Sequence, residues 1–91
     1  MIQKTMAQLS VVEFAEVLFT TSLQASDHPA SAAVRAAVQK SWTAGGAEST
    51  RFAARLAQEA GDHPEETARR MRWALEAAEG ILHRSRMQLA G

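Results

Sequence analysis

The spacing of apolar side chains predicts helices along the whole chain, because apolar positions recur every three or four residues rather than alternating. The first helix should begin after Leu9, where Ser10 and Glu13 have the spacing of a capping box. Leu9 and Phe14 flank this pair as a hydrophobic staple. The broad apolar face of this helix is expected to run as far as Leu23.

Two further helices are expected in the middle of the chain. One follows Pro29 and runs to about Thr43, and the glycine pair at 45–46 should end it because glycine readily adopts the left-handed conformation. The next covers about 47–60 and should stop at Gly61. Its apolar side chains lie one turn apart: Phe52, Leu56 and Ala60.

The fourth predicted helix has the most regular pattern. Its apolar side chains step by three and four residues, the spacing of a helix-bundle seam: Ala68, Met71, Leu75, Ala78 and Leu82. Asp62 and Glu65 have capping-box spacing at its start. Gly80 either ends this helix or only weakens it, so residues 83–91 form a C-terminal tail or a helix extension.

The tripeptide Asp-His-Pro occurs twice, at 27–29 and at 62–64, and each copy lies downstream of a similar segment, FAEVL or FAARL. This weak repeat predicts two antiparallel helical hairpins joined at the glycine pair. The expected fold is therefore all-α, a small four-helix bundle over residues 10–82 that follows a short N-terminal segment, 1–9.

Three stretches, SLQASDHP, AQEAGDHPE and RMRWAL, resemble a group of small uncharacterised proteins from high-GC actinomycetes. The resemblance covers about Leu18 to Ala77, with the three motifs in order. No activity is established for that group, so the resemblance assigns no functional residue. Phe52 stands where such relatives have a cysteine, so a thiol role in them would be absent from this chain.

Composition narrows the class of protein. Ten basic side chains balance ten acidic ones, so no broad field would attract nucleic acid. There is no cysteine, no secretory signal pattern and no apolar run of about 20 residues, which together favour a cytoplasmic protein without a membrane span. Much of the apolar content is alanine, and a core this thin favours self-association, with a homodimer as one expectation.

The two Asp-His-Pro copies raise the hypothesis of a metal site. In an up-down bundle both turns lie at one end, where Asp27, His28, Asp62 and His63 would offer two imidazoles and two carboxylates to zinc or nickel. The simpler interpretation, which we prefer, is structural. Aspartate would cap the following helix, and proline in a first helical turn costs no hydrogen bond.

One surface of the fourth helix has the composition of an interface. Trp73 is expected to lie nearly opposite the apolar seam, among arginines, and such a tryptophan is typical of a binding anchor. The alternative, equally weighted, is that this helix is buried on two sides and Trp73 packs on another helix, near Trp42. The candidate partner-binding residues are Arg69, Arg70, Trp73, Ala77 and Arg84.

Residues 51–75 have some features of a DNA-binding helix-turn-helix. Ala57 and Gly61 have suitable spacing, and an arginine-rich helix follows. Against this, the turn looks one residue too long, and Glu65 and Glu66 would meet phosphates at the leading end of the recognition helix. DNA binding is therefore the second choice.

The chain has no sequence motif of an enzyme: no nucleophile elbow, no phosphate-binding glycine loop and no His-Glu-x-x-His helix. We therefore expect a non-catalytic interaction or regulatory module without a cofactor. Its partner would be a protein, unidentified by the sequence, or a second copy of the chain.

Overall fold

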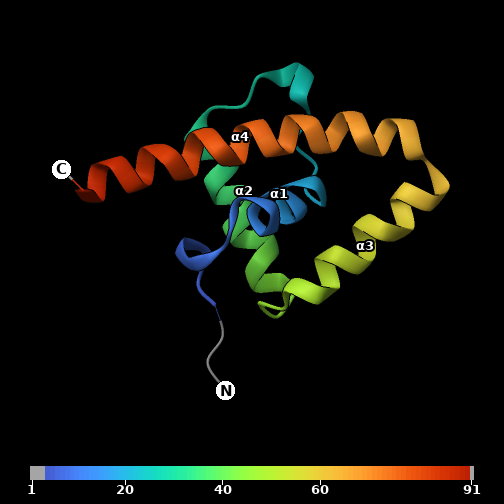
Figure 1. Cartoon of the computed structure of the whole chain (residues 1–91), viewed down its shortest axis with the longest axis horizontal. Coiled ribbons are helices and arrows are strands. Elements are labelled where there is room, and N and C mark those ends of the chain that lie inside the picture. The colour runs from blue at the N-terminus through green and yellow to red at the C-terminus, as the bar shows by residue number, and fades with distance from the viewer. Residues whose placement is uncertain (1–3, 91) are drawn as a thin grey trace.

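Helix α1 (Val11–Phe19) lies at the centre of the fold and contacts α2 (Ser31–Ala44), α3 (Ser49–Asp62) and α4 (Pro64–Ala90). The structure is a computed structural model that describes residues 4–90, and within them it is all-helical (Figure 1). The most extensive contact joins α1 to α4. The consecutive pairs α1–α2 and α3–α4 also pack together, and the prediction of a small all-α four-helix bundle is confirmed.

The predicted start of α1 is confirmed. The Ser10 hydroxyl accepts a hydrogen bond from the Glu13 amide at 3.1 Å, and the Glu13 carboxylate accepts one from the Ser10 amide at 3.0 Å. Leu9 and Phe14, the expected staple, are both 1% exposed. These local contacts satisfy amides that the helix leaves unpaired at its first turn.

Helix α1 ends earlier than its apolar pattern suggests, at Phe19 rather than near Leu23. The reason is the threonine pair that follows. The Thr20 hydroxyl donates to the Val17 carbonyl, and the Thr21 hydroxyl donates to the Leu18 carbonyl, each at 2.7 Å. Such side-chain bonds compete with the helical backbone pattern, so the chain leaves the helix here.

Helices α2 and α3 lie close to their predicted ranges. Helix α2 buries Val34, Val38 and Trp42, and the Trp42 ring stacks on Phe52 of α3 with centroids 5.7 Å apart. The glycine pair ends α2 as expected, with Gly46 in the left-handed region at φ 76°. Gly61 does not end α3, which continues to Asp62.

The apolar seam predicted for α4 is only partly correct. Ala78 and Leu82 are buried as expected, but Ala68 is exposed, and Met71 and Leu75 are only half-buried. The buried stripe is centred on Ala74 instead, and its members are Thr67, Ala74, Ala78, Ile81 and Leu82. Small alanine side chains let α1 approach α4 closely, and the larger residues then pack at the edges of the stripe.

Gly80 does not interrupt α4, which continues to Ala90 and reaches past the other helices in Figure 1. Residues 83–90 are therefore a helix extension and not a separate tail. At the N-terminal end of the chain, the Trp42 indole donates to the Lys4 carbonyl at 3.0 Å and holds the N-terminal segment to α2. Of the predicted terminal segments, residues 1–3 and 91 lie outside the described part of the chain.

The two Asp-His-Pro copies have different structures, which corrects the capping hypothesis. In the first copy, Asp27 ends a short 3-10 helix (Ala25–Asp27) and His28 is left-handed, while α2 begins after Ala30 without a side-chain cap. In the second copy, Asp62 is the last residue of α3, so neither aspartate occupies the cap position that we predicted for it. Only Pro64 has its expected role, at the first position of α4.

Candidate functional site

The five residues predicted to bind a partner line one side of α4, which we call the α4 flank: Arg69, Arg70, Trp73, Ala77 and Arg84. This side faces the connection between α1 and α2, which runs along one edge of α4 in Figure 1. Two shallow depressions lie between the α4 flank and residues 24–34, with volumes of about 300 and 210 Å³. The sequence did not predict that another segment of the chain borders these residues, and their role in binding stays a prediction.

Arg70 is part of the internal structure and not a free binding residue. Its guanidinium donates to three backbone carbonyls, those of Phe19 at 2.9 Å, Thr21 at 2.7 Å and Leu23 at 2.8 Å. The first is the terminal carbonyl of α1, where a positive charge also interacts favourably with the helix dipole. Burial lowers the pKa of Arg70 from its usual range, but the group stays charged at neutral pH.

Trp73 lies at the edge of the buried stripe, one position from Ala74, and is half-buried. Trp73 packs against the core and also lines the larger depression, while its role as a binding anchor stays a prediction. It does not reach Trp42, whose stacking partner is Phe52. The Arg70 guanidinium lies over the Trp73 ring, 5.2 Å from its centroid, and this cation–π contact fixes the indole.

The remaining members of the α4 flank differ in their exposure and in their hydrogen bonds. Arg69 is exposed and makes no hydrogen bond or ion pair within residues 4–90. Arg84 is exposed but donates to the Ser31 hydroxyl at 2.6 Å, and Ala77 is half-buried against the core. Arg69 is therefore the cation of this surface that is most available to an external carboxylate.

The predicted metal-site residues do not come together. Among the described residues, no group of three or more histidine and acidic side chains is placed to hold one metal ion. Asp27 and His28 lie in the α1–α2 connection, whereas Asp62 and His63 lie at the corner between α3 and α4, well apart in Figure 1. The prediction assumed that both turns share one end of the bundle, but the α1–α2 connection runs along the edge of α4, whereas the α3–α4 corner lies at the start of α4 (Figure 1).

The segment predicted as a helix-turn-helix has a different geometry. Helices α3 and α4 are joined through His63 alone, because Asp62 ends one helix and Pro64 begins the next. A DNA-binding helix-turn-helix uses a turn of about three or four residues. The connection is shorter than that, although the sequence pattern suggested a turn that was too long.

Sequence reasoning missed two polar clusters that join distant segments. The Glu13 carboxylate accepts hydrogen bonds from the Ser10 amide, from Ser49 of α3 at 2.7 Å and from Lys4 at 2.9 Å. These donors lower the pKa of Glu13 to about 2. In the second cluster, Arg35 of α2 donates to the Ser85 hydroxyl of α4. The capping box gave a signal for Glu13, but no local pattern indicated either long-range contact.

No family model, curated protein or solved structure matches this chain. The resemblance to small actinomycete proteins therefore stays a prediction. Within residues 4–90, no helix combines the length and apolar character needed to cross a membrane.

Proposed function

We propose that this chain is a non-catalytic module that binds a protein partner through the α4 flank. The observation that carries the proposal is the arrangement around Trp73, a half-buried indole held by Arg70 at the border of an open depression. Arg69, which is exposed, lines the same depression. An aromatic anchor beside an available arginine is the composition found at the energetic centres of protein interfaces.

The fixed position of Trp73 supports binding rather than packing alone. Arg70 is itself held by three carbonyls, so the indole that it covers loses little freedom when a partner docks. Preorganisation of this kind reduces the entropic cost of association. The partner should present an apolar side chain to Trp73 and a carboxylate to Arg69, and a second copy of the chain is one protein that could do so.

Charge reversal on the surface tests the proposal without disturbing the core. Arg69→Glu should abolish capture of the partner from cells that produce this chain, because it places a carboxylate against the partner's carboxylate. Arg55→Glu, an equally exposed change on α3, is the matched control and should leave capture intact. If both variants retain the partner, or both lose it, the α4 flank is not the binding surface.

DNA binding has less support, because the connection between α3 and α4 is a single residue and Glu65 and Glu66 occupy the first turn of α4. It makes a separable prediction. Binding to labelled DNA should weaken steeply with salt and should be lost in Arg69→Glu. Unchanged mobility of the DNA at low salt removes this alternative.

A further inference from the structure

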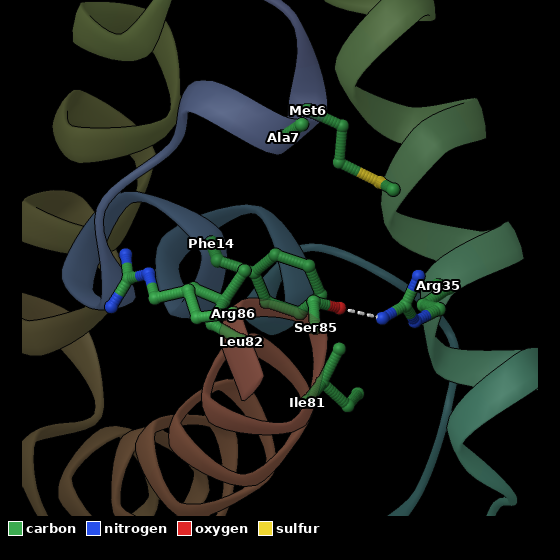
Figure 2. A pocket seen from close by; sticks show the side chains of 8 residues that line it. All are labelled: Met6, Ala7, Phe14, Arg35, Ile81, Leu82, Ser85 and Arg86. Atoms are coloured by element: carbon green, nitrogen blue, oxygen red, sulfur yellow. Dashed lines mark hydrogen bonds between the residues drawn. The ribbon is translucent and has the colours of Figure 1, made fainter. Parts of the chain in front are cut away.

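A small cavity lies on another side of α4, where the N-terminal segment, α1, α2 and α4 meet (Figure 2). Its volume is about 110 Å³ and its surface is mainly apolar. Figure 2 shows the Phe14 ring at its centre, with Met6 on one side and Ile81 on the other. Phe14 and Ile81 are 1% and 3% exposed, so the apolar wall is part of the rigid core.

Two arginines flank this apolar cavity. Arg35 comes from α2 and Arg86 from α4, and they lie on opposite sides of the Phe14 ring in Figure 2. The Arg35 guanidinium donates to the hydroxyl of Ser85, which also lines the cavity. This contact leaves further guanidinium donors, because an arginine carries five N–H groups.

Within residues 4–90, neither arginine is paired with a carboxylate. The ion pair in this part of the chain is that of Lys4 with Glu13. The chain as a whole has no net charge. The two arginines without a carboxylate partner nevertheless make the charge at this cavity locally positive. An anion that enters the cavity would therefore find donors without displacing an existing ion pair.

We propose that this cavity binds a carboxylate carried on a short, branched apolar body. The apolar body would lie against Phe14 and Ile81, and the carboxylate would pair with Arg35 at the polar rim beside Ser85. An apolar cavity of about 150 Å³ holds one benzene molecule, so the present cavity suits a body of about four or five carbon atoms. Free short-chain acids have this chemistry, and so does a leucine at the carboxyl end of a polypeptide. The site is separate from the α4 flank and does not depend on its function.

Titration of the wild-type chain with 4-methylpentanoate, followed by NMR of the amide and methyl groups, tests the site directly. We expect saturable shifts of Ile81 and Leu82, with a dissociation constant in the range of about 1 mM for so small a ligand. The matched ligand is 4-methylpentanamide, which has the same shape without the charge. It should bind about tenfold more weakly, because a charge-assisted hydrogen bond is lost.

Two variants test which arginine pairs with the carboxylate of the ligand. Arg35→Gln should weaken binding of the acid about tenfold and leave binding of the amide nearly unchanged. Arg86→Gln removes a more distant cation and should weaken binding of the acid only about twofold to threefold. Arg86 is exposed and makes no hydrogen bond or ion pair within residues 4–90, so this variant keeps the test valid if Arg35→Gln unfolds.

The source of the carboxylate is distinguished by a second ligand, a short peptide that ends in leucine, and its amidated form as control. Tighter binding of the free-acid peptide than of 4-methylpentanoate identifies a chain end as the natural ligand, whereas binding of the small acid alone identifies a free metabolite. The proposal is overturned if no saturable shift occurs at Ile81 and Leu82. It is equally overturned if acid and amide bind alike, because the cavity is then only a gap in the packing.

Discussion

Replacing Arg70 with methionine tests whether this side chain belongs to the fold, as its contacts indicate, or to a free binding surface. Methionine keeps much of the apolar stem but removes every hydrogen-bond donor. The carbonyls of Phe19, Thr21 and Leu23 would lose their partner, and Trp73 would lose the cation over its ring. The three hydrogen bonds join α4 to the end of α1 and to the connection that follows it, whereas the cation–π contact lies within α4.

The size of the effect follows from those contacts. A hydrogen bond to a charged group contributes about 1.5–3 kcal/mol to stability. Arg70 is only partly buried, so water can replace part of what is lost, and we expect a total loss of about 3 kcal/mol in the free energy of unfolding. For a domain of this size, that loss corresponds to a decrease of roughly 12–24 °C in Tm.

Thermal unfolding followed by circular dichroism measures this difference, with Arg69→Met as the matched control one position away. Arg69 is exposed and makes no hydrogen bond or ion pair within residues 4–90, so its replacement should change stability by less than about 0.5 kcal/mol. Arg70→Lys should lie between the two, since an ammonium keeps the charge but lacks the planar fork that spans several carbonyls. Equal melting temperatures for the two methionine variants would refute the structural role of Arg70.

Two further predictions concern stability. The pKa of Glu13 is about 2 in the folded chain, below its ordinary 4.5. The ionised carboxylate therefore stabilises the fold fully above about pH 4.5, and this stabilisation is lost as the pH falls toward 2. We expect the free energy of unfolding to fall by about 1–2 kcal/mol over that range, after allowance for solvent screening. The Glu13→Gln variant lacks this titration, so an acid-unfolding curve as steep as that of the wild-type chain would contradict the prediction. Gly45→Ala should destabilise the chain by about 1–3 kcal/mol, because a Cβ there would lie 2.6 Å from the buried Phe52 ring. Gly61→Ala, within α3 and with open space around it, should stabilise the chain by about 0.5–1 kcal/mol. Chemical denaturation measures both variants, and a Gly45→Ala chain more stable than Gly61→Ala would refute the close packing of Phe52 on Gly45.

The features that the sequence predicted well are those set by neighbours along the chain. The capping box of Ser10 and Glu13 needs only two residues at the correct spacing, and the structure contains both of its hydrogen bonds. The glycine pair after α2 likewise acts locally, through the left-handed conformation of Gly46. Helical periodicity then gave the fold class, because each helix has one apolar side that must be covered.

Features that depend on distant segments were not predictable in this way. The periodic pattern of α4 was broad enough to fit several stripes, and only the approach of α1 selects the one centred on Ala74. The role of Arg70 depends on carbonyls about fifty positions earlier in the chain, a separation that no local rule covers. The same limit explains the metal hypothesis, which placed His28 and His63 together because it assumed an up-down arrangement of equivalent hairpins.

The candidate surface was predicted in part. Trp73 and Arg69 border one depression as the composition suggested. The sequence could not separate Arg69 from Arg70, although one is exposed and the other is bonded to three carbonyls. Two adjacent arginines on a helix differ by about 100° in direction, and that rotation decides which of them faces the core.

Site-specific photo-crosslinking in the cells that produce the chain tests the central claim most directly. A photoreactive residue is placed at position 69 on the α4 flank and, in a parallel experiment, at the exposed position 55 on α3. The proposal predicts one discrete adduct from position 69 that is absent from position 55, and its mass distinguishes a second copy of the chain from a different protein. No adduct at position 69, or the same adducts at both positions, would contradict binding through the α4 flank.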